Sequence, residues 1–205
     1  MQIADATALV TGANRGIGLA FTRALLARGA RKVYAGARDP ATVTQPGAEP
    51  IRLDVTRPEQ VAAAAAREML ETNVFGVRRV SRAFAPVLAS HGGGALLNVL
   101  SIASWINPGV LAAYAASKSA AWSLTNAQRH ERAAQGTQVT ALHMAFVDTD
   151  LVRALEVPKT SPEEIAERAL DGLEAGLDEV LADERTRLIK QGMTAARPSY
   201  LPPLR

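Results

Sequence analysis

The 205-residue sequence contains no cysteine, and this absence removes several kinds of site at once. Disulfide bonds, thiolate zinc sites and cysteine nucleophiles are all excluded. The sequence also lacks any apolar run near the ~18 residues of a membrane span, and its N-terminus lacks the basic and then apolar pattern of a secretion signal. These absences predict a cytoplasmic protein that has no membrane partner.

A strong excess of either charge is missing too. The formal net charge is +3 and the isoelectric point is near 9.6, which alone would suit a nucleic-acid partner. The basic residues are scattered among acidic ones, however, and the one small cluster, Arg78, Arg79 and Arg82, is expected to form a solvated helix face. We therefore expect no nucleic-acid partner. No linker or shift in composition divides the chain, so residues 1–205 are expected to form a single domain.

Short apolar segments alternate with helical stretches along the sequence. Such alternation predicts an α/β fold with a doubly wound, Rossmann-like parallel sheet and helices on both faces. Ligands of this fold bind beyond the carboxyl ends of the strands. Ser161-Pro162-Glu163-Glu164 has the pattern of a helix start, with serine as the N-cap and proline in the first turn. The predicted strands are 7–10, 32–35, 50–53, 95–100, 138–143 and 179–181.

A glycine-rich turn follows the first predicted strand and opens the helix expected at 19–27. Glycines permit a tight turn and a close approach of the backbone to a ligand, and the first helical amides then point at an anion. A strand, such a turn and a helix together predict a dinucleotide pyrophosphate site, although a plain strand-to-helix turn is the alternative. The candidate binding residues are Gly12, Asn14, Arg15, Gly16, Ile17 and Gly18.

A second motif lies about a hundred residues further on. It is Tyr114-Ala115-Ala116-Ser117-Lys118, and Ser101 stands thirteen residues before the tyrosine. Together with the Thr-Gly-x-x-x-Gly-x-Gly turn, these residues resemble the short-chain dehydrogenase/reductase family of the classical type. The likeness extends from about residue 7 to about residue 181.

The resemblance implies roles for the residues of this second motif. Tyr114 would be the acid or base that exchanges a proton with the substrate, and Ser101 would hold the substrate oxygen. Tyr114 and Lys118 share a helix face, so the ammonium of Lys118 is expected to lower the tyrosine pKa from about 10 and to bind the nicotinamide ribose. Asn73 matches the helix asparagine that supports a proton path to the lysine in this family, with a helix kink as the alternative.

The cofactor is predicted from the residues that follow the second strand. Arg38 stands where NAD-dependent family members carry an acidic residue, and Arg15 lies within the glycine turn. Because a guanidinium suits a 2′-phosphate, we expect NADP(H) rather than NAD(H). The alternative is that both are ordinary surface residues, with Arg38 paired to Asp39. The resemblance also implies that Asp54 and Val55 contact the adenine and that Val147 and Thr149 contact the nicotinamide.

Two parts of the family pattern are missing from this sequence. The Asn-Asn-Ala-Gly motif of the fourth strand is absent, and a strand with its connection needs on the order of 20–35 residues. We therefore predict that residues are missing between Ala66 and Arg67, with a true deletion and a degenerate fold as the alternative. Met144-Ala145 replaces a common Pro-Gly, and His143 beside it is expected to be structural.

The predicted function is an NADP(H)-dependent oxidoreductase that interconverts a small-molecule carbonyl and alcohol. A catalytically silent NADP(H)-binding regulator or sensor of the same fold is the alternative. Apolar candidates for the substrate pocket are Trp105, Ile106, Pro108, Phe146 and Leu151. Helices 69–88 and 114–135 are expected to form a homodimer or homotetramer through Phe75, Val80, Phe84, Ala121, Trp122 and Leu124.

Overall fold

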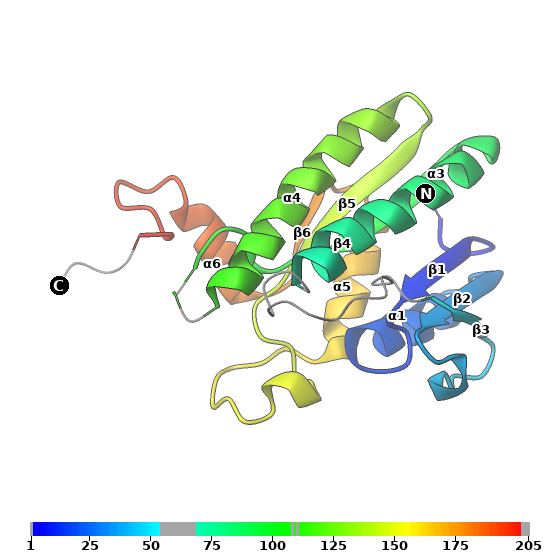
Figure 1. Ribbon diagram of the computed structural model, residues 1–205, viewed down its shortest axis with the longest axis horizontal. Coiled ribbons are helices and arrows are strands. Elements are labelled where there is room, and N and C mark those ends of the chain that lie inside the picture. The colour runs from blue at the N-terminus through cyan, green and yellow to red at the C-terminus, as the bar shows by residue number, and fades with distance from the viewer. Residues whose placement is uncertain (1, 54–68, 108, 110, 202–205) are drawn as a thin grey trace. The chain divides into compact units, whose positions relative to one another are not determined.

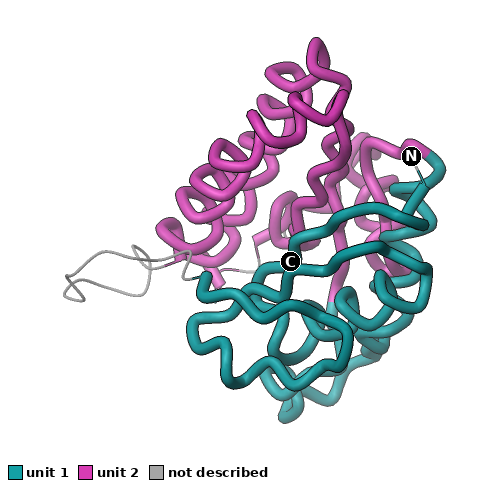
Figure 2. The backbone as a smooth tube through the Cα atoms, turned by 90° about the vertical axis from the view of Figure 1, so that its right-hand side faces the viewer, with its two compact units in different colours: residues 1–54, 146–175 teal, residues 55–145, 176–205 magenta. Residues whose placement is uncertain are grey.

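The computed structural model describes residues 2–53, 69–107, 109 and 111–201, which belong to two compact units (Figure 2). Residues 1–54 and 146–175 make up the first unit, and residues 55–145 and 176–205 make up the second. Each unit contains one three-stranded parallel sheet with helices packed against it. The predicted α/β class with parallel strands is therefore confirmed.

The first unit is built on strands β1 (Thr7–Thr11), β2 (Lys32–Ala37) and β3 (Glu49–Arg52), paired in that order (Figure 1). Helix α1 (Gly16–Ala27) packs on β1 and β2, and α5 (Pro162–Glu174) packs against α1. The helix α5 begins as its sequence predicts, because the Ser161 side chain accepts a hydrogen bond from the Glu164 amide at 3.1 Å.

The second unit is built on β4 (Gly94–Val99), β5 (Thr137–His143) and β6 (Glu179–Leu181), also paired in chain order. Helix α3 (Val77–Ser90) contacts β4 and α4 (Ala112–Ala133) contacts β5, so both helices cover this sheet (Figure 1). Its buried residues include Leu100, Ala121 and Ala141, which form one apolar cluster. The short helix α6 (Glu184–Gly192) follows β6.

All six strands predicted from the sequence are present, and their ends differ from the predicted ends by two residues or fewer. Several predictions lie outside the described residues: the contacts of Asp54 and Val55, the junction of Ala66 with Arg67, and the place of Pro108. The missing segment and the single domain therefore stay predictions. Among the helices within the described ranges, none has both the length and the apolar character needed to cross a membrane.

Candidate active site

The glycine turn has a conformation and a packing that require glycine. Gly16 has a positive φ of 53°, in the left-handed region that favours glycine. A Cβ added to Gly18 would lie 2.2 Å from the carbonyl oxygen of Gly12, so α1 starts in direct contact with the turn. The Ala13 amide donates to the Gly36 carbonyl oxygen at 3.0 Å, which ties the turn to β2. The turn is therefore held rigidly at the end of two parallel strands.

The beginning of α1 is open to an anionic ligand. Arg15 stands at the N-cap position with an extended backbone and makes no capping hydrogen bond with its side chain. The first amides of a helix carry partial positive charge and, without a side-chain cap, can donate to phosphate oxygens. Asn14 and Ile17 are half-buried within this turn. The geometry fits the pyrophosphate of a dinucleotide, as the sequence predicts.

The segment after β5 lies beside this turn. A Cβ on Gly16 would lie 3.6 Å from the methyl carbon of Thr149. Thr149, which is predicted to contact the nicotinamide, therefore lies next to the start of α1. Val147 pairs with Thr160 in a parallel bridge, and the Thr160 amide donates to the Phe146 carbonyl oxygen at 3.0 Å. The backbone around Val147 and Thr149 is thus fixed by the residues that precede α5.

Arg38 follows β2 and is exposed, as is Arg15. Among the described residues Asp39 forms no ion pair with Arg38; its carboxylate accepts a hydrogen bond from the Ala41 amide at 3.0 Å and caps a short 3-10 turn. Within the described residues, neither Arg15 nor Arg38 forms an ion pair. Both guanidinium groups therefore remain available to a phosphate, and the paired alternative for Arg38 is not what the structure has.

Ser101 and Tyr114 belong to the second unit and lie next to each other. Ser101 follows β4, is 7% exposed, and accepts a hydrogen bond from the Ala103 amide at 3.1 Å. Its hydroxyl lies close enough to the phenol of Tyr114 on α4 to act on the tyrosine pKa. The structure therefore brings the predicted proton donor to the serine that stands thirteen residues before it.

Lys118 is one helical turn beyond Tyr114, with its ammonium nitrogen 5.7 Å from the centre of the tyrosine ring. That ammonium donates to the Val99 carbonyl oxygen at 2.9 Å, so the lysine is anchored to the end of β4. Burial lowers the pKa of Lys118 to about 8. The side chain is a cation in most molecules at neutral pH and is close to losing its proton.

The prediction that Lys118 lowers the pKa of Tyr114 is wrong for this structure. Burial disfavours the phenolate and raises the tyrosine pKa above its usual value of 10.0, and the Ser101 hydroxyl offsets this only in part. The physical reason is burial of the phenol, and Lys118 is not among the groups that shift this pKa. Tyr114 is therefore held in its protonated form near neutral pH.

Asn73 lies in a π-helical turn, Glu71–Gly76, that precedes α3. Its side-chain amide donates to the Ser117 hydroxyl at 2.8 Å, and that hydroxyl donates to the Tyr114 carbonyl oxygen at 2.7 Å. Asn73 thus contacts α4 between the tyrosine and the lysine. Single π-helical turns often occur at functional sites, and this one directs the asparagine toward α4. Its part in a proton path stays a prediction.

His143 lies behind Ser101 and is completely buried. Its ring stacks on Trp105 with centres 4.0 Å apart, and its Nδ1 is 3.3 Å from the Ser101 carbonyl oxygen. Because a carbonyl can only accept, Nδ1 carries the proton. The neutral ring then presents an unprotonated Nε2 to the Glu179 carboxylate, 3.7 Å away. The expectation of a structural histidine agrees with this burial, and the ring also fixes the peptide of the predicted catalytic serine.

The partners of this histidine were not found from the sequence. Glu179 accepts hydrogen bonds from Trp122 at 3.1 Å and from Lys190 at 2.7 Å, and the Lys190 ammonium lies over the Trp105 ring at 4.6 Å. Burial alone would raise the pKa of Glu179, but these two hydrogen bonds hold it below its usual value. The only signal in the sequence for Glu179 was a glutamate at the start of a short apolar strand.

Leu151, which was expected to line the substrate pocket, is 93% exposed.

Comparisons with known proteins agree with this geometry. The sequence matches the model of the family described as short chain dehydrogenase over residues 6–67 and 58–159. Galactitol 2-dehydrogenase (L-tagatose-forming) of Cereibacter sphaeroides is 33% identical over 189 residues, which cover 73% of this chain and 74% of that enzyme. The 3-oxoacyl-acyl-carrier-protein reductase FabG of Vibrio cholerae is 26% identical and covers 76% of this chain and 79% of its own length.

Among solved structures, a short chain dehydrogenase from Burkholderia cenocepacia J2315 in complex with NADP is 35% identical, with a TM-score of 0.89. The match covers 96% of this chain and 95% of that one. A gluconate 5-dehydrogenase from the same organism, in complex with NADP and tartrate, has a TM-score of 0.76 at 21% identity and covers 87% and 93% of the two chains, a likeness of fold alone.

The buried histidine makes stability depend on pH. Burial lowers the pKa of His143 to about 4, whereas an unfolded histidine titrates near 6.5. The unfolded chain therefore binds more protons between these values, so stability is lost as the pH falls from about 6.5 toward 4. We expect the free energy of unfolding to fall by about 2 kcal/mol because of this residue as the pH is lowered from about 7 to 5.

Urea unfolding of the wild type and of H143N at both pH values measures this cost. Asparagine has no titrating ring and keeps a donor at the position of Nδ1, so H143N should show a smaller loss. His91 is exposed, and H91N is the matched control that should behave like the wild type. An equal loss in H143N and wild type would contradict the assignment.

Proposed function

The chain belongs to the short-chain dehydrogenase family, and we propose that it transfers hydride between NADP(H) and a small-molecule carbonyl or alcohol, with Tyr114 as the acid or base. That it is an oxidoreductase acting on alcohol and carbonyl groups follows from the family itself. One observation carries the finer proposal: the Ser101 hydroxyl lies beside the Tyr114 phenol and acts on its pKa, with Lys118 one turn away. The cytoplasmic location expected from the sequence is part of the same proposal.

The residues of the second unit divide the work of proton transfer. Ser101, whose hydroxyl lies beside the phenol, holds the substrate oxygen. Tyr114, which is protonated near neutral pH, donates its proton to that oxygen during reduction. Lys118 provides a positive charge beside the site and binds a ribose hydroxyl. Bound NADPH supplies the hydride.

NADP(H) is favoured by two features of the first unit. The glycine turn with the open start of α1 suits a pyrophosphate, and Arg15 and Arg38 are guanidinium groups without an ion pair in the part of the chain that the structure describes. Both side chains can form charge-assisted hydrogen bonds with a 2′-phosphate. The 35% identical structure contains NADP, which supports the same choice here.

The proposal also includes a segment missing between Ala66 and Arg67 that would carry the fourth strand of the family. The family match breaks into two stretches that meet at residues 58–67. In addition, 73% of this chain is about 150 residues, so about 39 of the 189 positions aligned with galactitol 2-dehydrogenase have no counterpart here. The break in the family match supports a segment missing near residues 66–67, and the aligned lengths agree with a chain that is shorter than this relative.

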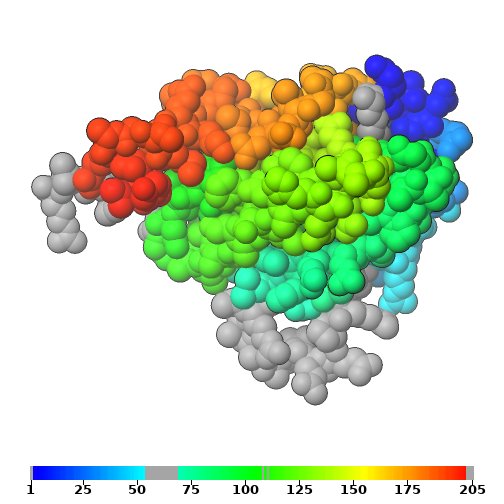
Figure 3. Space-filling model, turned by 90° about the horizontal axis from the view of Figure 1, so that it is seen from above, coloured from blue at the N-terminus to red at the C-terminus, as the bar shows by residue number. Residues whose placement is uncertain are grey.

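We also propose a homodimer or homotetramer assembled through α3 and α4 (Figure 3), which contact each other. Phe75 just before α3 is 46% exposed and Val87 within it is 50% exposed, which leaves apolar surface for a second copy. Ala121, which was expected at this interface, is instead buried in the apolar cluster of its own unit. Light scattering at micromolar concentration should give at least twice the monomer mass, and a monomer mass would refute the proposal.

Replacing Tyr114 with phenylalanine tests the chemistry. The ring and its packing remain but the transferable proton is lost, so turnover should fall by roughly 10²–10⁴-fold while the affinity for NADPH stays nearly constant. The measurement is NADPH oxidation against a panel of aldehydes, ketones and quinones, with Tyr34→Phe on β2 as a control that keeps activity. Undiminished turnover in Y114F would exclude the role. NADPH binding by the wild type without any turnover across the panel would favour the sensor.

Replacing Arg38 with aspartate tests the choice of cofactor. Repulsion then replaces a charge-assisted contact with the 2′-phosphate, so NADPH affinity should fall by about tenfold or more while NADH affinity changes little. Arg31 precedes β2 as Arg38 follows it, so R31D is a control of equal charge change. The measurement is fluorescence titration with both cofactors. Equal losses for NADPH and NADH in R38D would contradict the assignment.

A further inference from the structure

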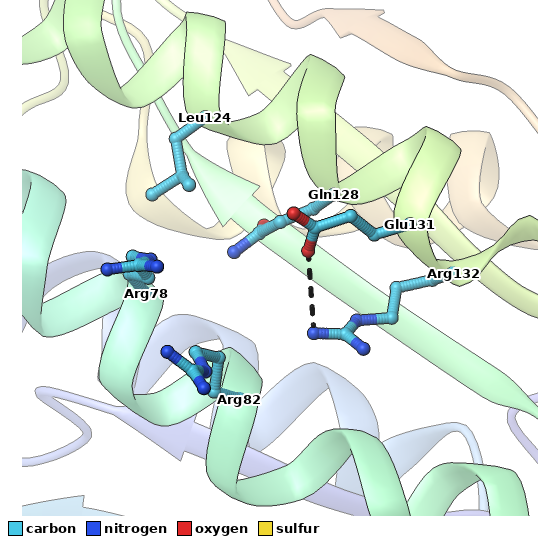
Figure 4. Close-up of a pocket in the computed structure, with 6 residues that line it drawn as sticks. All are labelled: Arg78, Arg82, Leu124, Gln128, Glu131 and Arg132. Carbon is cyan, nitrogen blue, oxygen red and sulfur yellow. Dashed lines mark ion pairs between the residues drawn. The ribbon is translucent and has the colours of Figure 1, made fainter.

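Basic side chains are partly enclosed at two places in the second unit. One place is the groove between α3 and α4, where Figure 4 shows Arg78, Arg82 and Arg132. Because these two helices form the proposed interface between subunits, we expect a second copy of the chain to cover this groove. The other place surrounds Lys190, which lies on α6 and so belongs to neither helix (Figure 1).

The ammonium of Lys190 is held by one carboxylate and two indole rings. It donates to the Glu179 carboxylate at 2.7 Å, and it lies 4.6 Å from the centre of the Trp105 ring and 5.4 Å from that of Trp122. The two indole rings are nearly perpendicular, at 86°, so they face the cation as two separate walls. Because a carboxylate and the faces of aromatic rings both attract a cation, these three residues form a box that suits an ammonium group.

The carboxylate of Glu179 lies between this lysine and His143. One of its oxygens accepts the hydrogen bond from Lys190. The other accepts a hydrogen bond from the Trp122 indole at 3.1 Å and lies 3.7 Å from Nε2 of His143. The charge of Lys190 is therefore separated from the histidine ring by a single carboxylate.

The ring of His143 carries one proton near neutral pH but has an acceptor beside each of its nitrogens. Burial, together with the positive charges of Lys190 and Lys118, lowers the pKa of His143 to about 4. Its Nδ1 is 3.3 Å from the Ser101 carbonyl oxygen, and its Nε2 faces the Glu179 carboxylate. A neutral imidazole can donate to only one of these two acceptors.

The two acceptors compete for this proton, and the charge of Glu179 decides the outcome. A hydrogen bond to a charged acceptor is roughly twice as strong as one to a neutral carbonyl. An unbalanced carboxylate would therefore draw the proton to Nε2 and leave Nδ1 without a donor for the Ser101 peptide. The ammonium of Lys190 balances the carboxylate, and the Trp122 indole occupies the oxygen that faces the ring. Both contacts favour a proton on Nδ1.

We propose that Lys190 is a positioning residue of the catalytic site, which acts on Ser101 through Glu179 and His143. By balancing the glutamate it keeps the histidine proton on Nδ1, and the hydrogen bond from Nδ1 fixes the peptide that carries the serine hydroxyl. This role rests on the proposed function, in which Ser101 holds the substrate oxygen. Through it, α6 contributes to a site whose other residues come from β4, β5 and α4.

Steady-state kinetics of NADPH oxidation with the best carbonyl substrate of the panel tests this role. Methionine fills the box without a charge, so K190M should lower kcat by about tenfold, as expected for a misplaced serine, with little change in KM or in NADPH affinity. K190R keeps the positive charge and should retain most of the turnover. R185M removes a positive charge from an exposed position of the same helix, so it should behave like the wild type.

The double variant K190M/H143N tests whether Lys190 acts through the histidine. Asparagine has no second nitrogen to which a proton could move, so adding K190M to H143N should lower kcat much less than it does in the wild type. Nuclear magnetic resonance of ¹⁵N-labelled histidine gives the tautomer directly. The signal that H143N removes should show a proton on Nδ1 in the wild type and on Nε2 in K190M.

Four results would overturn the role of Lys190. They are an unchanged kcat in K190M, equal losses in K190M and K190R or in K190M and R185M, an equal effect of K190M with and without H143N, and a ring that keeps its Nδ1 proton in K190M. A wild type that binds NADPH without turning over any compound of the panel would instead overturn the proposed function, and this role with it. The two failures are therefore distinguished by the wild type alone.

Discussion

Backbone pairing between β4 and β5 continues beyond the ends of both strands. The positions of Ser101 and Tyr114 in the second unit depend on this pairing. The Leu100 amide donates to the Leu142 carbonyl oxygen at 2.8 Å, and the Ile102 amide donates to that of Met144 at 3.0 Å. The peptide of Ser101 lies between these two bonds. Because Lys118 is bound to the carbonyl oxygen of Val99, the helix that carries the tyrosine is also fixed to this strand end.

Burial decides the protonation states around this strand end. It raises the pKa of Tyr114, lowers that of Lys118 to about 8 and lowers that of His143 to about 4, so each shift favours the neutral form. One pKa unit corresponds to about 1.4 kcal/mol, so the shifts of Lys118 and His143 are large compared with a typical surface ion pair. The outcome is a protonated tyrosine, a neutral histidine that supports the serine peptide, and a lysine near its titration point.

The sequence was sufficient to predict features that depend on local patterns. Strand positions follow from short apolar runs. The turn follows from the spacing of its glycines, and the cap of α5 follows from Ser161 and Pro162. Contacts between distant residues could not be predicted in this way. Glu179 and Lys190, which surround His143, lie on β6 and α6, two elements that the chain forms only after α5. The prediction of a lowered tyrosine pKa was wrong because spacing on a helix does not show how deeply the phenol is buried.

The central claim is that this chain transfers hydride, and the most direct measurement is to follow that hydrogen. NADPH labelled with deuterium at both C4 positions is incubated with the protein and a carbonyl compound, and the product is examined by mass spectrometry. The expected result is an alcohol with deuterium on its carbinol carbon, one atom for each NADP⁺ formed. NADPH that binds and is never oxidised, or an alcohol without deuterium at that carbon, would contradict the claim.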